Sequence, residues 1–224
     1  YAWEAFDVQS TAIWNDHSHR LDLKYWEPTL RQRIEVVRAA GGKTLEALNT
    51  IETQRGSSPK ADLYVDQADG YAMVVKAGSS ISRYGELAAE GADYIEKNVY
   101  EDQPAKSNIQ EGDILLASTG DGTLGKCCVS HQSLPAVADG HVTILRVDPA
   151  VIDPDYLADY LRIGFGRDQI ERLFTGSTGL VELTPEHVKS VVVDLLSRVE
   201  EQRERSRTLR LAEASYRQAV TGAE

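Results

Sequence analysis

The stretch EGDILLASTGDGTLGKCCV, residues 111–129, decides how this chain folds. It contains two short apolar runs, and residues 120–126 between them match the phosphate-loop pattern G-x-x-x-x-G-K letter for letter. In a phosphate loop this pattern joins a strand to a helix, whereas in a β-hairpin a glycine-rich turn joins two strands. The residues that follow Lys126 distinguish the two structures.

Those residues favour the hairpin. Cys127 stands where a phosphate loop has the Ser or Thr that holds Mg²⁺, the sequence CCVS is a poor helix former, and Pro135 follows closely. Asp121 would also place a carboxylate among the phosphates. We therefore expect a turn between antiparallel strands and no bound cofactor. The alternative, a nucleotide-hydrolysing enzyme, predicts that Lys126→Ala abolishes ATP binding.

Composition bounds the class of protein. The chain has 224 residues, which suits one domain with an appendage, and no apolar run approaches the ~18 residues of a membrane-spanning helix. The two cysteines, Cys127 and Cys128, are adjacent and do not suggest a disulfide, so we expect a reducing, cytoplasmic setting. Because the chain begins at Tyr1 without a signal-peptide pattern, we expect it to be a piece of a longer protein.

The formal net charge of −11 argues against unaided, nonspecific nucleic-acid binding. Such binding depends on Lys and Arg side chains that displace counterions from phosphates. Any proposal of DNA binding therefore has to explain which groups contact the phosphates.

Periodicity and turn residues predict an α+β fold: a mixed, mostly antiparallel sheet with short helices, followed by a long C-terminal helix. Asp153 and Pro154 suit the N-cap and first turn of a helix, and Thr184 suits the N-cap of another. Helices are expected at residues 22–40, 153–165, 166–174, just after 184, and from 197 onward. Strands are expected at 71–75, 113–118, 126–130, 141–147 and 191–196, and a loop at 54–62.

No arrangement of residues specifies a catalytic reaction. The tetrapeptide DPDY, residues 153–156, is similar to the catalytic motif of amino-methyltransferases but lacks its second proline. His17 and His19 beside Asp16 suggest a metal clip, but no further ligands occur at a recognisable spacing, and Cys127, Cys128 and His131 fit no zinc pattern. We expect neither a metal site nor a catalytic centre.

An ordered set of motifs resembles the target recognition domain of type I restriction–modification specificity subunits (HsdS). In chain order these motifs are KTLEAL, QRGSSP, EGDILLASTGDGTLGKCCV, ADGHVTILRVDP, DPDYLADYL, IERLFTGSTGLVEL and LLSRVEEQRE. The chain departs from the family pattern in lacking the usual Pro-Pro before Glu-Gln and in having one recognition domain instead of two. Its lead-in is similar to segments of related proteins that carry a fused methyltransferase.

The resemblance implies three parts: a lead-in with a helix at 1–42, a recognition domain at 43–196, and a spacer or dimerisation helix at 197–224. The implied function is sequence-specific recognition of double-stranded DNA, which directs a partner N6-adenine methyltransferase in restriction–modification and phage defence. Implied partners are that methyltransferase, as a subunit or a fused domain, a restriction or translocase subunit, and a second recognition domain or copy. The last would pair along a helix seam of Leu195, Val199, Gln202, Ser206, Leu209, Glu213, Tyr216 and Val220.

Three loops would carry the DNA contacts, because small and hydroxylated residues let the backbone approach a groove. Arg55 could pair with guanine, Gln54 with adenine, and Asp121 with the cytosine amino group. A turn at 83–84 could add another contact. The candidate residues are Gln54, Arg55, Ser57, Ser58, Arg83, Tyr84, Thr119, Gly120, Asp121, Gly122, Thr123, Lys126, Thr175, Gly176, Ser177 and Thr178.

A different class of function stays open. The long C-terminal helix could dock a protein partner, with the glycine-rich loops serving only as turns, and the negative charge favours this interaction module. Replacing Arg55 and Lys126 together discriminates the two, because only the DNA reader should lose sequence-selective binding.

Overall fold

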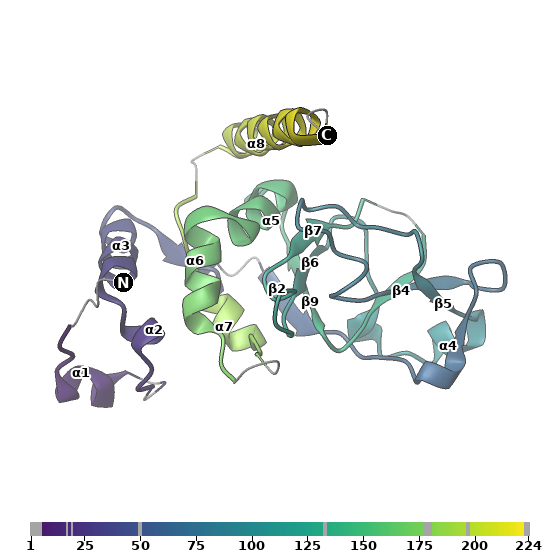
Figure 1. Ribbon diagram of the computed structural model, residues 1–224, viewed down its shortest axis with the longest axis horizontal. Helices are drawn as coiled ribbons and strands as arrows, with labels where there is room; N and C mark the ends of the chain where they lie inside the picture. The colour runs from purple at the N-terminus through teal and green to yellow at the C-terminus, as the bar shows by residue number, and fades with distance from the viewer. Residues whose placement is uncertain are drawn as a thin grey trace.

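The structure is a computed structural model that describes residues 6–16, 18, 20–48, 51–131, 134–176, 181–195 and 198–221. It confirms the predicted α+β class, with mixed sheets, short helices and a long C-terminal helix (Figure 1). The helices are α1 (Ser10–Asn15), α2 (Leu23–Trp26), α3 (Pro28–Ala39), α4 (Lys97–Glu101), α5 (Pro154–Arg162), α6 (Gly164–Leu173), α7 (Pro185–Lys189) and α8 (Val199–Thr221), with 3₁₀ turns at Glu46–Leu48, Ala61–Leu63 and Ala105–Ser107. The strands are β1 (Lys43–Thr44), β2 (Ile51–Arg55), β3 (Tyr64–Val65), β4 (Ala72–Val75), β5 (Asp93–Ile95), β6 (Ile114–Ala117), β7 (Cys127–Val129), β8 (Ala136–Ala138), β9 (Val142–Val147) and β10 (Val192–Val193).

The central sheet has the order β2-β9-β6-β7 and is antiparallel throughout. Its strand β6 places Ile114 and Leu116 on one face and Leu115 and Ala117 on the other, and all four side chains are fully buried. A strand that is covered on both faces needs apolar residues at every position. This explains why ILLA, residues 114–117, is a continuous apolar run without alternation.

A second sheet, β3-β5-β4-β8, covers one face of the central sheet. Its strands pair antiparallel except β4 and β8, which run parallel with Val74 opposite Val137. Met73 and Val75 of β4 pack against Leu115 and Ile144 of the central sheet in one apolar cluster. The two sheets thus pack face to face and form the β-rich half of the molecule, with α4 against the second sheet.

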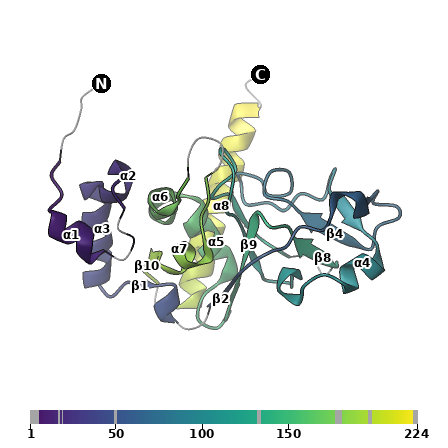
Figure 2. The same cartoon turned by 90° about the horizontal axis from the view of Figure 1, so that it is seen from below.

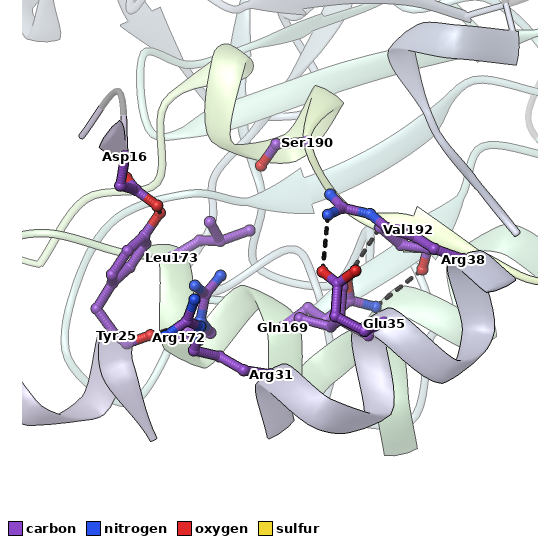
Figure 3. A pocket seen from close by; sticks show the side chains of 11 residues that line it. Asp16, Tyr25, Arg31, Glu35, Arg38, Gln169, Arg172, Leu173, Ser190 and Val192 are labelled. Carbon is purple, nitrogen blue, oxygen red and sulfur yellow. Dashed lines mark hydrogen bonds and ion pairs between the residues drawn. The ribbon is translucent and has the colours of Figure 1, made fainter. Parts of the chain in front are cut away.

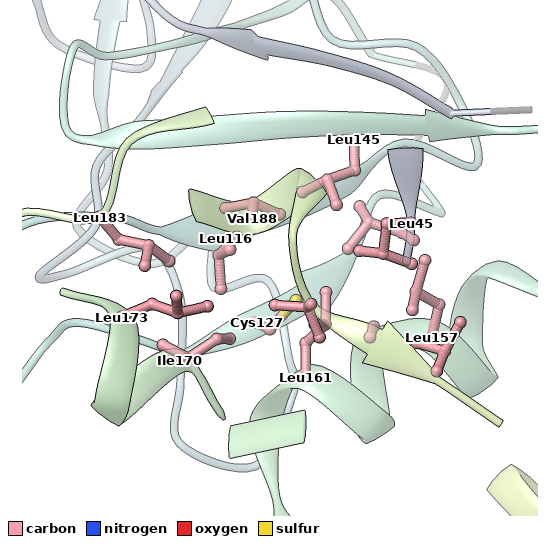
Figure 4. Packing of buried hydrophobic residues seen from close by; sticks show 14 of the residues in the cluster. Leu45, Leu116, Cys127, Leu145, Leu157, Leu161, Ile170, Leu173, Leu183 and Val188 are labelled. Carbon is pink, nitrogen blue, oxygen red and sulfur yellow. The ribbon is translucent and has the colours of Figure 1, made fainter. Parts of the chain in front are cut away.

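Helices α5, α6 and α7 cover the other face of the central sheet (Figure 4). Leu157 and Leu161 of α5 and Ile170 of α6 are fully buried there against Leu116 and Cys127. The predicted caps are present, because the Asp153 side chain accepts a hydrogen bond from the backbone N–H of Tyr156 and Thr184 makes a capping box with His187. The amphipathic segments at 153–165 and 166–174 therefore fold as predicted.

The two cysteines lie back to back on β7. Cys127 faces the helices and Cys128 faces the second sheet, which agrees with the prediction that neighbours on a strand point apart. Both thiols are free and buried, and burial raises the pKa of Cys128 to about 12 and that of Cys127 well above its usual range.

The prediction of a single helix over residues 22–40 is wrong. The Asp22 carboxylate caps α2, the chain then turns at Glu27, and Pro28 begins α3, whose first N–H groups bond to the Glu27 carboxylate. Proline suits the first turn of a helix but not its interior, so the break falls where Pro28 requires it. These N-terminal helices lie beside α6 (Figures 1 and 2), where Arg172 Nε donates to the Tyr25 carbonyl over 2.7 Å.

Helix α8 lies along α5, on the side of the molecule away from α7 (Figures 1 and 2). Gln202 Oε1 accepts a hydrogen bond of 2.8 Å from the Asp153 N–H, and Glu213 binds the Arg162 guanidinium at 2.7 Å. The buried hydroxyl of Ser206 donates to the Asp159 carboxylate. The polar middle of the predicted seam is therefore occupied by α5 of the same chain. None of the described helices is long and apolar enough to cross a membrane.

Candidate nucleic-acid interface

The residues around Glu182 bring together the second and third of the predicted loops. Glu182 exchanges two backbone hydrogen bonds of 2.8 Å with Thr175 and forms a second β-bridge with Thr119. On either side of it, Val181 accepts from the Gly120 N–H over 3.1 Å and Leu183 donates to the Ser118 carbonyl over 2.8 Å. Two loops that are more than fifty residues apart in sequence thus share one short stretch of backbone.

Arg55 joins the first predicted segment to the same place. Its Nη2 lies 3.0 Å from Glu182 Oε1 and donates to the Leu183 carbonyl over 2.8 Å. Its Nη1 donates to the Gly140 carbonyl over 3.2 Å. We call Arg55, Thr119, Thr175 and Glu182 the Glu182 junction.

The residues after Arg55 pack against the turn before β9. The Ser57 N–H donates to the Ala138 carbonyl over 3.0 Å, and Ser58 Oγ accepts from the Gly140 N–H over 3.0 Å. A Cβ at Gly56 would lie 2.3 Å from the carbonyl oxygens of residues 138 and 139, so only glycine allows this approach. The QRGSSP motif therefore owes its glycine to close packing against β8.

Part of the first-loop prediction is wrong. Gln54 and Arg55 lie in strand β2, paired with Ile144 and Thr143 of β9, and not in a loop. The Arg55 side chain is 19% exposed, and both of its terminal nitrogens are bonded within the protein. Pairing with guanine would require Arg55 to break these bonds, so its observed role is to hold the junction together.

The second loop is a preformed turn. Gly120 and Gly122 have φ values of 89° and 79°, which favour glycine, and Thr123 Oγ1 donates to the Thr119 carbonyl over 2.6 Å. Thr119 Oγ1 also lies 2.7 Å from His141 Nδ1. Asp121 and Gly122 are exposed at the tip. The connection joins antiparallel β6 and β7, so the hairpin prediction is confirmed and the phosphate-loop alternative lacks its helix.

The third loop is described in part. Thr175 and Gly176 are exposed beside the Glu182 junction, whereas Ser177 and Thr178 lie outside the described residues. Within the described residues, Thr175 lies close to the second loop because Glu182 bridges both Thr175 and Thr119.

Three candidates lie away from the junction. The Arg83 carbonyl accepts from Arg162 Nη1 over 3.1 Å, and the Tyr84 ring lies 4.7 Å from the Arg217 guanidinium of α8. Lys126 Nζ donates to the Gly78 carbonyl over 3.2 Å, next to the turn after β4. Arg83 and Tyr84 therefore lie with α5 and α8 and not with the other candidates. The backbone of Lys126 stays in the second loop, where its N–H donates to the Thr123 carbonyl over 3.0 Å, but its side chain binds elsewhere.

Sequence reasoning missed two residues at this surface, Glu182 and His141. Both are exposed, and Glu182 is the partner that unites the junction. His141 begins a segment that was predicted only as a strand, and Glu182 lies between a predicted loop and a predicted helix cap, so a long-range bridge was not foreseen. His141 also donates its N–H to the Asp139 carboxylate over 2.9 Å, and burial raises the pKa of Asp139.

The surface carries hydroxyls, glycines and carboxylates and little positive charge. Asp121 and Glu182 are exposed, while Arg55 is neutralised by Glu182. Such a surface can offer hydrogen-bond donors and acceptors to base edges but cannot by itself neutralise many phosphates. No group of three His, Cys, Asp or Glu side chains among the described residues could hold a metal ion, and His17 and His19 lie outside those residues.

Comparison with known proteins gives a fold likeness without a sequence match. No protein-family model and no curated protein matches the sequence. Among solved structures, the S subunit of a type I restriction–modification system from M. genitalium superposes with a TM-score of 0.53, 16% identity, 77% of this chain and 38% of that chain. The chain has the fold of a type I S subunit recognition domain.

Three further structures have a similar fold. The HsdS subunit from Thermoanaerobacter tengcongensis gives a TM-score of 0.52 at 13% identity, covering 84% of this chain and 44% of that chain. A chain of a type I restriction–modification assembly gives a TM-score of 0.57 at 14% identity, covering 87% of this chain and 48% of that chain. The type IIG restriction endonuclease BpuSI gives a TM-score of 0.56 at 10% identity, covering 82% of this chain and 28% of that chain. The match thus covers less than half the length of each of these four chains.

Proposed function

We propose that this chain is a sequence-reading module of a restriction–modification system, which binds double-stranded DNA through the loops around the Glu182 junction. The observation that carries the proposal is the convergence of Arg55, Thr119 and Thr175 on Glu182. The S subunit fold supports it, because in a type I restriction–modification system the subunit with this fold is the specificity subunit.

The chemistry of the surface suits base recognition more than phosphate binding. Thr175, Gly176, Asp121 and Gly122 are exposed and small, so a DNA groove can approach the backbone closely. Asp121 can accept from a cytosine amino group, and Thr175 can donate or accept. The module would therefore supply selectivity and rely on another protein for most of the phosphate contacts.

That other protein would be an N6-adenine methyltransferase, as a subunit or a fused domain, with a restriction or translocase subunit in the complete assembly. In this arrangement the chain itself performs no chemistry. The likeness to BpuSI, an endonuclease, supports the fused variant of the same plan.

The test is methylation-site sequencing of DNA from cells that carry the intact gene, a deletion, or a gene encoding Asp121→Ala and Thr175→Ala. The proposal predicts a methylated motif that disappears in the deletion and changes or weakens at specific positions in the double variant. A control variant, Asp62→Ala, alters an exposed residue in the second-sheet half and should leave the motif unchanged. Identical methylation in all four strains would contradict the proposal.

The interaction-module alternative has one supporting observation. Leu211, Tyr216 and Val220 of α8 remain exposed at 64%, 67% and 48%, although the polar side of the helix is docked on α5. A partner that binds α8 would use these apolar side chains, and their replacement would then reduce partner binding without changing the methylated motif.

A further inference from the structure

A cavity of about 220 Å³ lies between the N-terminal helices and α6 (Figure 3), and none of the Glu182 junction residues lines it. Arg31 and Arg38 of α3 and Arg172 of α6 line it, together with the carboxylates of Asp16 and Glu35. We call it the arginine pocket. Its lining side chains come from segments more than 130 residues apart in the sequence, so the folded structure assembles it.

Both carboxylates of the pocket already have partners. Glu35 Oε1 lies 3.1 Å from Arg38 Nη1 on the same helix. Both oxygens of Asp16 lie 3.0 Å from the Tyr25 hydroxyl, and Oδ1 also accepts from Ser18. In Figure 3 these two groups lie on opposite sides of the pocket, with Arg31 and Arg172 between them.

Arg31 and Arg172 lack such a partner. Neither guanidinium has a carboxylate oxygen within 4.0 Å among the described residues of the chain. The Arg31 guanidinium lies 4.4 Å from the Trp26 ring, and that of Arg172 lies 4.0 Å from the Tyr25 ring and donates through Nε to a backbone carbonyl. Arg172 thus contacts the backbone and ring of Tyr25, and no carboxylate of the described residues balances its charge.

The electrostatic state of Arg172 differs from that of the paired arginines. Burial is the largest effect and lowers the pKa of Arg172. Tyr25 partly opposes it, the nearby positive charge of Arg31 lowers the pKa by less, and Asp16 raises it least. In contrast, the hydrogen bond to Asp113 raises the pKa of Arg146. An anion that binds both guanidinium groups would offset their mutual repulsion and the cost of burying the charge of Arg172.

We propose that the arginine pocket binds a phosphate group between the guanidinium groups of Arg31 and Arg172. Guanidinium pairs bind phosphate through several charge-assisted hydrogen bonds, and three arginines against two carboxylates leave one positive charge to be balanced. The phosphate can come from a DNA backbone or from a free phosphate compound, and these sources share the same chemistry at the pocket.

The experiment titrates the full chain with sodium phosphate by isothermal titration calorimetry at an ionic strength held constant with sodium chloride. Wild-type protein should bind with a dissociation constant on the order of 1 mM or tighter. Arg31→Gln should weaken binding by about tenfold, because it removes charge-assisted hydrogen bonds, and Arg31→Lys should recover part of the loss. The matched control is Arg33→Gln on the same helix, whose guanidinium pairs with Asp168 outside the pocket.

Competition then separates the two sources of phosphate. If the pocket takes a backbone phosphate, a DNA duplex displaces the inorganic phosphate. In that case Arg31→Gln also lowers, by about one, the number of counterions released on DNA binding, as measured from the slope of log K against log salt concentration. If it takes a free compound, the duplex leaves phosphate binding unchanged. Phosphate binding that is absent in the wild type, or equal in wild type and Arg31→Gln, would overturn the proposal and leave the DNA-reading role untouched.

Discussion

Arg55 Nη2 lies 3.0 Å from Glu182 Oε1 across 127 residues of sequence, and this pair fixes where two predicted loops meet. The same nitrogen bonds the Leu183 carbonyl, while the neighbouring one bonds Gly140. The guanidinium group that the sequence presents as a base reader is therefore bonded within the protein, where it links Glu182, Leu183 and Gly140. Its loss should disturb the arrangement of the loops rather than delete one contact.

Arg55→Met tests this role. We expect a loss of about 1–3 kcal/mol in the free energy of unfolding, because two backbone carbonyls lose their donor. Selectivity should weaken across the whole DNA motif instead of at one base. Urea unfolding and binding-site selection measure the two effects. Gln54→Ala, next to it on β2, is the control and should change stability by less than about 0.5 kcal/mol. A variant with unchanged stability and lost recognition of one guanine would show that Arg55 is a reader after all.

A second pair explains two of the sequence motifs. Asp113 of EGDILL is 1% exposed and binds Arg146 of ILRVDP through two hydrogen bonds of 2.8 and 2.7 Å. Asp113→Asn should lower the free energy of unfolding by about 3 kcal/mol, because it removes the buried negative charge that pairs with the guanidinium of Arg146. The matched control is Glu52→Gln, since Glu52 approaches the same arginine at 3.7 Å but is 76% exposed and should contribute under about 0.5 kcal/mol. Equal effects of the two substitutions in urea unfolding would contradict this account.

The attachment of α8 to α5 makes a third prediction. Gln202→Leu removes the acceptor of the buried Asp153 N–H and should lower the free energy of unfolding by about 1–3 kcal/mol. Amide hydrogen exchange of α8 should accelerate in this variant. Arg203→Ala, which removes a mostly exposed partner of Asp153, should leave the exchange of α8 close to that of the wild type. Unchanged exchange in Gln202→Leu would mean that α8 is held by other contacts.

The fourth prediction concerns pH. Because burial raises the pKa of Cys128 to about 12 in the folded protein, the folded state favours the neutral thiol. The stability this provides is fully present below the thiol's unfolded pKa, roughly 8.5, and declines as the pH rises from there toward 12. The free energy of unfolding should therefore fall over this range, and less so in Cys128→Ala. An identical alkaline slope in both proteins would refute the prediction.

The sequence predicted the local elements well where a residue's chemistry acts on its neighbours. The caps at Asp153 and Thr184, the apolar run of β6 and the hairpin before Cys127 all follow from short-range rules. The break at Pro28 follows from such a rule too, but the regular apolar spacing around it concealed the break.

The candidate site was predicted in part, because its geometry depends on distant pairings. Gln54 and Arg55 of β2 were placed in a loop, since IETQR shows no apolar alternation and pairs with β9, about 90 residues away in sequence. Arg83 and Tyr84 were added to the candidates as a turn, whereas their contacts with Arg162 and Arg217 place them beside α5 and α8. Lys126 lies at the end of the second loop, as its motif suggests, but its side chain binds the Gly78 carbonyl. Glu182 carries no local signal of its role, because both of its bridges are made by other loops.

The central claim is that the loops at the Glu182 junction read DNA sequence. Its most direct test is enrichment of bound duplexes from a randomised pool, with wild-type chain and the Asp121→Ala, Thr175→Ala double variant, each in complex with the proposed partner methyltransferase. We predict that the wild type enriches one motif and that the double variant relaxes it at particular positions while still binding DNA. Enrichment of the same motif by both proteins, or of none by the wild type, would contradict the claim.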